Sequence, residues 1–191
     1  MRHAFSAAGD RDRMKPLPRL VLIGLGHTMR RDDGVGLWVA RRIQARSHPG
    51  LMVIPMGVPD PIALAQAWEG ATIAWIVDAV IAAKPPGTLL RLRWDRLLID
   101  PQGRRFSTHG ISLWEAITLA RMLHEPPLQM IVYGIVGQDF SHGEGLSPEV
   151  EAGAYRLLCR LERLIPRILR DFGSGATLLR QDPRIPPKLP V

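Results

Sequence analysis

Residues 19–36, RLVLIGLGHTMRRDDGVG, decide the fold of this chain. The segment 19–26 is a short run of branched apolar residues that closes on glycines, which is typical of a strand buried on both faces. A polar loop follows, and residues 35–44 then carry apolar side chains at helical spacing. This stretch therefore predicts the strand, loop and helix with which a parallel α/β sheet begins.

The same alternation of strand and helix patterns continues along the chain. We expect the remaining elements at these positions: strands at residues 51–56, 72–77, 88–94 and 128–136, and helices at residues 62–68, 112–123 and from Pro148 onward. Pro55 favours an edge position for the second strand. Residues 88–94 alternate apolar and basic side chains, which predicts an antiparallel strand with one wet face. Together the elements predict a three-layer α/β/α sandwich around a mostly parallel, twisted sheet of about five strands, one of them antiparallel.

A chain of 191 residues has the length of one domain with a sizeable core. We expect a flexible leader at residues 1–18, a single α/β domain at residues 19–171 and a tail rich in proline and glycine at residues 172–191. Within the domain, Ser147 is expected to cap the last helix and Pro166 to bend or end it.

The net charge of +7 suggests a nucleic-acid partner, but the distribution of the charge argues against one. Residues 1–19 contain five basic and two acidic residues, and residues 156–191 contain eight basic and three acidic residues. The body, residues 20–155, contains twelve basic and thirteen acidic residues. Proteins that read a nucleic-acid groove usually concentrate their charge on the folded face, beside a recognisable motif. We therefore expect no nucleic-acid partner, although the basic ends could steer an acidic one.

The single cysteine, Cys159, cannot form an internal disulfide and indicates a reducing compartment, most simply the cytoplasm. It falls nearly opposite the apolar face of the last predicted helix, so we do not expect it to act as a nucleophile. No apolar run reaches the roughly 18 residues of a membrane span. Charges interrupt the first residues of the chain, which do not resemble a signal peptide.

Polar side chains stand at the predicted carboxyl ends of the strands, where open α/β sheets bind ligands. Asp32 and Asp33 precede a helix; capping accounts for one of them, but two adjacent carboxylates exceed what a cap needs. Asp78 either bonds the backbone of residues 80–82 or binds a ligand, and its pairing with Asp33 across adjacent strand ends favours the ligand. His109 stands among small residues ahead of a helix. Two carboxylates and an imidazole suit nickel or zinc.

A nucleotide site is another interpretation of the first loop. The pair Gly24-x-Gly26 resembles part of a dinucleotide fingerprint, but Met29 stands where the third glycine belongs. A P-loop would need Gly-Lys-Ser or Gly-Lys-Thr, which this loop lacks. A nucleotide-binding α/β protein is therefore our third hypothesis, and nucleotide-dependent thermal stabilisation would test it.

From about residue 21 to about residue 164 the chain resembles the maturation endopeptidases of nickel-iron hydrogenases. The resemblance rests on these motifs, in this order: Gly24-x-Gly26 followed by Asp32-Asp33-Gly34-Val35-Gly36, then Ile76-Val-Asp78-Ala79, then Ser107-Thr-His109, and finally Gly145-Leu-Ser-Pro148-x-Val150. Each motif alone is weak. Their order and spacing, with the same strand and helix pattern, are fairly specific.

The resemblance implies an endopeptidase that removes the C-terminal extension of a hydrogenase large-subunit precursor after nickel insertion. Asp33, Asp78 and His109 would be its catalytic residues and would meet the nickel. The nickel would belong to the substrate's active site and would serve as a checkpoint, and zinc or another divalent ion could act as a surrogate. We expect a monomer without a cofactor-binding site of its own.

The chain departs from the family pattern at three places. His27 stands where members often carry Asn, which makes it a candidate additional ligand, and Asp33 stands where many carry Glu. Residues 57–60 replace a Gly-Gly-Thr turn, and we expect Asp60 to be an ordinary turn residue. The departures at His27 and residues 57–60 motivate an alternative function: a non-catalytic nickel-binding or assembly protein for hydrogenase maturation.

Overall fold

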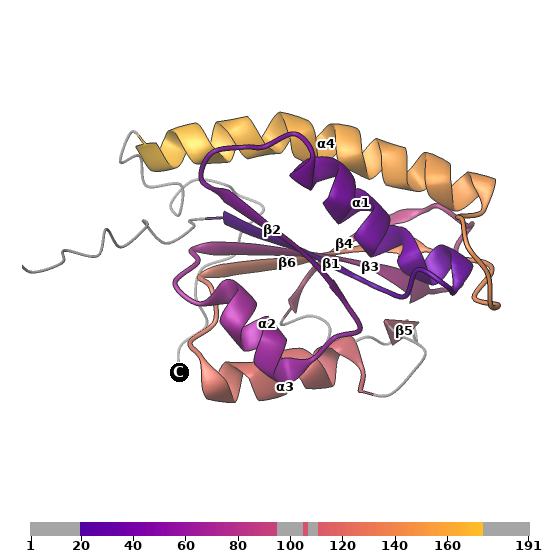
Figure 1. Ribbon diagram of the computed structural model, residues 1–191, viewed down its shortest axis with the longest axis horizontal. Coiled ribbons are helices and arrows are strands. Elements are labelled where there is room, and N and C mark those ends of the chain that lie inside the picture. Colours follow the sequence, from indigo (N-terminus) through magenta and orange to yellow (C-terminus); the bar gives the residue numbers. More distant parts are fainter. Residues whose placement is uncertain (1–19, 95–104, 107–110, 174–191) are drawn as a thin grey trace, which may run out of the picture.

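The computed structural model describes residues 20–94, 105–106 and 111–173, which form a six-stranded sheet with helices on both faces (Figure 1). The elements follow one another in this order: β1 (Leu20–Leu25), the short 3₁₀ helix η1 (Arg31–Gly34), α1 (Val35–Gln44), β2 (Leu51–Gly57), α2 (Pro61–Trp68), β3 (Ile73–Ile81), β4 (Leu89–Arg93), β5 (Arg105–Phe106), α3 (Leu113–Leu123), β6 (Gln129–Val136) and α4 (Pro148–Gly173).

The sheet has the strand order β2-β1-β3-β6-β4. Its first four strands run parallel, whereas β4 is antiparallel to β6 and the two-residue β5 is antiparallel to the end of β3. β2, which contains Pro55, lies at one edge, as the sequence predicts, and the predicted antiparallel strand β4 lies at the other. The three-layer sandwich with a mostly parallel sheet and an antiparallel strand is confirmed. The strand β5 was not predicted, because two residues carry no periodicity.

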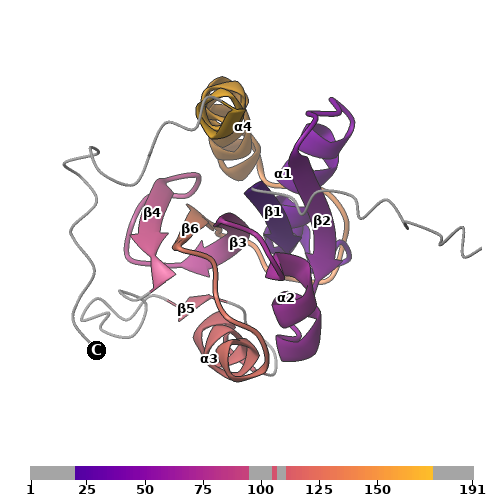
Figure 2. The same cartoon turned by 90° about the vertical axis from the view of Figure 1, so that its left-hand side faces the viewer.

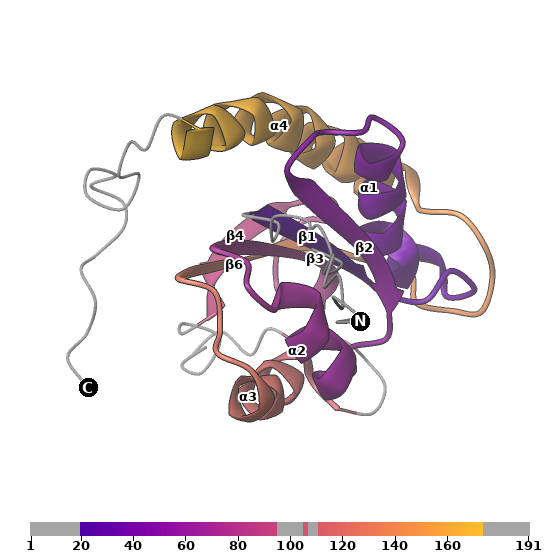
Figure 3. The same cartoon turned by 60° about the vertical axis from the view of Figure 1, so that its left-hand side comes forward.

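Helices α1 and α4 cover one face of the sheet, and α2 and α3 cover the other (Figures 2 and 3). Successive side chains of β1 point alternately towards the two helix layers. Leu20 and Leu22 pack towards α1 and α4, whereas Val21, Ile23 and Leu25 pack towards α2 and α3. All five side chains are fully buried, so the centre of the sheet is apolar on both sides, as a covered parallel sheet requires.

The terminal helix α4 crosses the sheet without stopping at its proline. Pro166 lies inside α4, which continues to Gly173. Cys159 is exposed on this helix, in agreement with its predicted place away from the apolar face. Within the described part of the chain no helix is long and apolar enough to cross a membrane. The leader at residues 1–18 lies outside the described residues, as does nearly all of the tail, so the division into segments stays a prediction.

Glycines let α1 lie directly on the backbone of the sheet. A Cβ atom on Gly36 would overlap the carbonyl oxygens of Val77 and Leu25, and one on Gly24 would overlap the carbonyl oxygen of Gly36. Gly26 has a φ of +122°, and a Cβ atom there would overlap the carbonyl oxygen of Asp33. These close approaches fix η1 above the carboxyl ends of β1 and β3. They also give the glycines of the first loop a packing role that needs no bound phosphate.

We expect Gly36→Ala to lower the free energy of unfolding by at least about 3 kcal/mol, because the overlap is with backbone atoms that cannot turn away. The matched control is Gly34→Ala, two residues earlier, where the nearest atoms to a new Cβ lie at 3.4 Å and φ is −73°. Urea denaturation of both variants checks this. Equal losses for the two would show that the close approach of α1 does not hold the fold together.

Candidate active site

The carboxyl ends of β1, β3 and β6 meet at one edge of the sheet because these neighbouring strands are parallel. The register between β1 and β3 ends with Gly24 opposite Val77, whereas β3 continues to Ile81. The expectation that this strand stops before Asp78 is therefore wrong: β6 and β5 extend its pairing. Asp78 lies within β3, one residue beyond Val77, the last residue that pairs with β1. At this position β3 lies next to η1.

Asp78 is a buried carboxyl group with one unsatisfied oxygen. Asp78 is only 2% exposed. Oδ1 accepts a hydrogen bond from its neighbour's backbone, the N–H of Ala79, at 2.9 Å. Oδ2 is buried and has no hydrogen-bond partner among the described residues. Residues 80–82 do not bond the carboxylate, so the structural role considered for Asp78 is not the one it has.

Asp33 is the second carboxylate of the site. It belongs to η1 and is 8% exposed, and its backbone N–H donates to the carbonyl of Arg30 at 3.1 Å. Burial, and next the negative charge of Asp33, raise the pKa of Asp78 well above its ordinary value of 3.8, against a smaller opposing effect of the Ala79 N–H. The structure thus brings together two of the three predicted site residues. Either a proton or a cation must offset their repulsion.

Asp32, the neighbour of Asp33, has a different role from helix capping. The N-terminal positions of η1 and α1 belong to Arg30 and Gly34, and neither helix is capped by a side chain. The Asp32 carboxylate is fully buried and accepts these hydrogen bonds from the loop between β6 and α4: Gln138 N–H at 3.0 Å, Asp139 N–H at 2.9 Å, Ser147 N–H at 2.7 Å and the Ser147 hydroxyl at 2.9 Å. It therefore joins the two loops that border the site.

Ser147 takes the predicted position at the start of α4, since its carbonyl accepts the N–H of Glu151 at 2.9 Å. Its hydroxyl, however, is directed to Asp32. The negative charge of Asp32 consequently lies at the N-terminal end of α4, where the helix dipole favours an anion.

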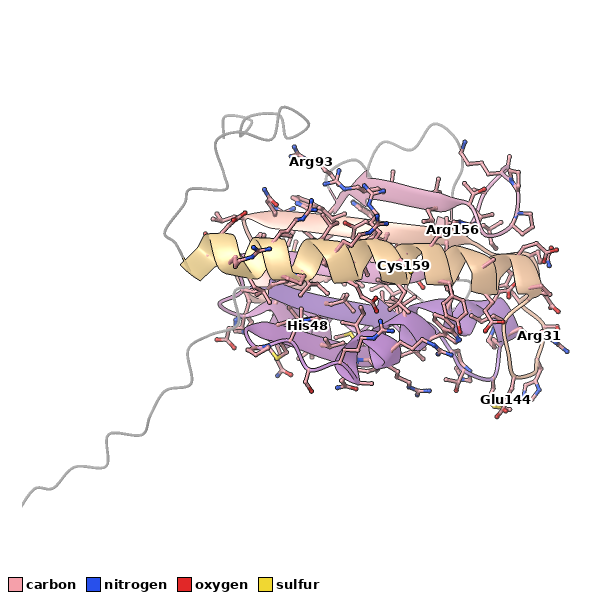
Figure 4. All side chains as sticks on the ribbon, turned by 90° about the horizontal axis from the view of Figure 1, so that it is seen from above. Arg31, His48, Arg93, Glu144, Arg156 and Cys159 are labelled. Atoms are coloured by element: carbon pink, nitrogen blue, oxygen red, sulfur yellow. The ribbon has the colours of Figure 1, made fainter. Side chains whose placement is uncertain are left out.

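The two loops also pair through their backbones. Arg31 N–H donates to the carbonyl of Gly143, and Gly143 N–H donates to the carbonyl of Met29, both at 2.9 Å. The Arg31 side chain contacts Asp139 with an Nε to Oδ2 distance of 3.2 Å. The loop between β6 and α4 runs beside the η1 loop in Figures 1 and 3. In Figure 4, Arg31 and Glu144 lie at this same end of the molecule. The η1 loop and the loop between β6 and α4 therefore form one side of the site together, and we call this pair of loops the wall.

The third predicted residue, His109, lies outside the described residues, so its meeting with the two carboxylates stays a prediction.

His27 is exposed, and its Nδ1 accepts the N–H of Met29 at 3.2 Å, so only Nε2 could serve as a ligand atom. Asp60 caps α2 by accepting the Ala63 N–H at 2.7 Å, in keeping with the expected turn role. Among the described residues, no group of three His, Cys, Asp or Glu side chains could hold a metal ion.

We expect Asp32→Asn to destabilise the protein by about 3 kcal/mol, since the amide presents an N–H₂ group to N–H donors and leaves them unpaired in a buried place. Amide hydrogens of residues 138–147 should exchange faster than in the wild type. Asp139→Asn, on an exposed carboxylate in the same loop, is the control and should leave the unfolding midpoint nearly unchanged. Unaltered exchange in Asp32→Asn would contradict the role of Asp32.

The raised pKa of Asp78 predicts a pH dependence of stability. Above 3.8 the unfolded chain releases this proton while the folded protein keeps it, so stability falls as pH rises, by up to about 1.4 kcal/mol per pH unit, until the folded group also ionises. Asp78→Asn should lack this component. Urea titrations of both proteins across mildly acidic and neutral pH check it, and parallel pH profiles would contradict it.

Comparisons with known proteins agree with this architecture. The model of the hydrogenase maturation protease family HycI matches residues 39–163, a stretch that includes Asp78 and begins just after the η1 loop. The hydrogenase expression/formation protein HupD of Thiocapsa roseopersicina is 25% identical in an alignment of 174 residues that covers 85% of this chain and 73% of that protein.

Solved structures share the fold. The [NiFe] hydrogenase maturation protease HybD from Thermococcus kodakarensis superposes with a TM-score of 0.64 and 25% identity, over 77% of this chain and 99% of that one. The hydrogenase maturating endopeptidase HybD from E. coli gives a TM-score of 0.65 at 18% identity, over 78% and 93% of the two chains. Because the family model covers more than half of its length, the chain belongs to the hydrogenase maturation proteases and is a peptidase.

Proposed function

We propose that this peptidase removes the C-terminal extension of a nickel-iron hydrogenase large-subunit precursor once nickel has been inserted, and that Asp33, Asp78 and His109 recognise that nickel. The observation that carries the proposal is the buried Asp78 carboxyl group, whose Oδ2 has no partner among the described residues and which faces the charge of Asp33. A carboxyl group in this state favours the arrival of a cation.

The two carboxylates make the protein sensitive to the metal in its substrate. Without a cation, burial and the charge of Asp33 raise the pKa of Asp78 and so favour its protonated form. A divalent ion at the site would favour the ionised form and release that proton, because ligand carboxylates bind metals deprotonated. A precursor without nickel would bring no cation to replace that proton, so it would gain no bond to the two carboxylates and would dock less well. The site would thus test for nickel before cleavage.

His109 completes the donor set in this proposal. Two carboxylate oxygens and an imidazole nitrogen are donors that nickel accepts, and zinc accepts them as well. A metal held there could also polarise the scissile carbonyl group or a water molecule. The wall that Asp32 fixes would keep Asp33 in place as the precursor enters.

The test is processing of the precursor, followed by gel mobility and by the mass of the released tail. We expect the wild type to cleave the nickel-loaded precursor and not the nickel-free one. Asp78→Ala and His109→Ala should lose at least about a hundredfold in kcat/KM, the usual effect of losing a group that stabilises the reacting atoms. Glu125→Ala and His124→Ala, which remove a carboxylate and an imidazole at exposed or half-exposed sites, are the controls and should process normally.

Unchanged processing in both Asp78→Ala and His109→Ala would overturn the assignment of these residues. Stable binding of the precursor by the wild type without release of a tail would favour the non-catalytic assembly role instead. Cleavage of the nickel-free precursor at the same rate would overturn the nickel checkpoint while leaving the peptidase intact.

A further inference from the structure

An open groove of about 710 Å³ lies on the α1 and α4 side of the molecule, between α4 and the edge strand β4. Its charged lining consists of arginines of α4, and apolar side chains of β4 and α4 lie between them: Arg156, Arg160, Arg163 and Arg167, with Leu89 and Leu164. No acidic residue is among the described residues that line it. We call this surface the arginine groove.

The arginines gather there because of helical periodicity. The apolar stripe of α4 is buried against the sheet, and its members are Val150, Ala154, Leu157, Leu161 and Ile165. The four arginines recur three or four residues apart, so they form one row along a flank of the helix. In Figure 4, Arg93 and Arg156 lie on the same side of α4. The row is therefore a continuous basic face.

The edge strand β4 contributes a second basic element. Leu89 packs with the core layer beneath α4, and the alternation of a strand places Arg91 on the same face. Arg91 lies opposite Tyr133 of β6 and hydrogen-bonds its side chain. The charge of Arg160 also reaches Tyr133, whose pKa is raised by burial and lowered in part by these two arginines. Guanidinium groups of α4 and β4 thus converge on one buried hydroxyl.

Acidic groups near the groove are engaged elsewhere. Glu162 of α4 pairs with Arg46, which follows α1, and Glu149 accepts a hydrogen bond from the Gln138 side chain at 3.0 Å. The parts of the chain outside the description have no acidic excess: residues 1–19, 95–104 and 174–191 each contain at least as many basic as acidic residues. Charge complementarity therefore points to an acidic ligand from another molecule.

The dimensions of the row suit an extended peptide. From Arg156 to Arg167 the helix rises about 17 Å, which equals about five residues of extended chain. The Arg156 end is fixed to the turn before β4, where its guanidinium donates to the carbonyl of Gly87 at 2.9 Å. A Cβ atom on Gly153 would overlap that carbonyl, so α4 and the turn are in direct contact. This is the end of the groove towards the start of α4, where Ser147 contacts Asp32.

We propose that the arginine groove binds an extended acidic segment of a protein partner, with carboxylates on the arginine row and apolar side chains against Leu89 and Leu164. Naming the hydrogenase precursor as the protein that carries this segment rests on the function proposed above. The planar guanidinium group matches a carboxylate in a two-point contact. Docking in the groove holds the partner at a distance from the scissile region and raises the local concentration of its tail at the site.

A peptide ligand accounts for the surface better than a nucleic acid does. Single strands bind by stacking bases on exposed aromatic rings between basic groups. Among the described residues that line the groove, Tyr155 is the one aromatic residue; it is 48% exposed and packs edge-on against Trp38, so the groove offers a single ring and not a series of stacking rings. The apolar floor formed by Leu89 and Leu164 has no counterpart in a surface that follows a phosphate backbone.

The first test is fluorescence anisotropy with a labelled peptide of alternating glutamate and leucine. Arg160→Glu combined with Arg167→Glu should weaken its binding by about tenfold or more, because charge-assisted contacts are lost and replaced by repulsion. Arg41→Glu combined with Arg121→Glu changes the net charge equally at exposed positions on α1 and α3, outside the groove, and should stay within about twofold of the wild type. Arg160→Lys combined with Arg167→Lys should retain most of the binding.

Equal weakening by the control pair would overturn the proposal, because it would show binding to net charge alone. Tighter binding of a thymidine oligonucleotide than of the peptide would overturn it in favour of a nucleic-acid surface. Full binding of a peptide with glutamine in place of glutamate would overturn it as well. The melting temperatures of all variants should match that of the wild type, since the substituted side chains are exposed.

The second test is precursor processing. The glutamate pair at 160 and 167 should raise KM by about tenfold and leave kcat unchanged, the pattern of a lost binding contact remote from the reaction. An unchanged KM would overturn the docking role for the precursor. If the wild type failed to process any precursor, the proposed function would fall, whereas the peptide titration would still decide whether the groove binds acidic segments.

Discussion

The buried carboxylate of Asp32 is the interaction on which the site depends. A fully buried charge is costly unless donors surround it, and here backbone N–H groups and a hydroxyl from a loop more than 100 residues away supply them. The carboxylate can occupy this position because glycines bring η1 onto the backbone of β1 and β3. The hydrogen bonds of Asp32 and the close contact of η1 with the strands therefore place Asp33, the next residue, beside Asp78. Neither the loop nor the helix could provide that placement alone.

Asp32 and Asp78 are both buried, but their surroundings give them different chemistry. Asp32 has its oxygens satisfied and is structural. Asp78, nearly as well buried, has one oxygen without a described partner and faces a like charge. The hydrogen bonds of Asp32 stabilise the wall, whereas the unsatisfied oxygen of Asp78 is available to a cation in our proposal. In our proposal the Asp78 carboxylate is unfavourable in the free protein because it has too few partners. A substrate that carries its metal supplies the missing partner and therefore binds more tightly.

The sequence was sufficient for the layers, the antiparallel β4 and the pairing of Asp33 with Asp78, because buried strands and their polar ends leave local patterns. It was insufficient for Asp32. Its partners Gln138, Asp139 and Ser147 are distant in the chain, and an Asp before a helix has the same local pattern whether it caps or anchors. It also placed the end of β3 too early, since the pairing partners that carry the strand past Asp78 are themselves remote. The arginines of α4 fall within the last predicted helix, but only the fold shows that Arg91 and Arg160 both approach Tyr133.

We propose that Asp78 holds a proton until a metal-bearing substrate arrives. Infrared difference spectroscopy of the protein at mildly acidic pH measures this directly, with Asp78→Asn as the reference for the band of a protonated carboxylic acid. We predict that adding nickel-loaded precursor removes the Asp78 band and that nickel-free precursor leaves it in place. A spectrum in which Asp78 is already ionised in the free protein, or stays protonated with the nickel-loaded precursor bound, would contradict the account.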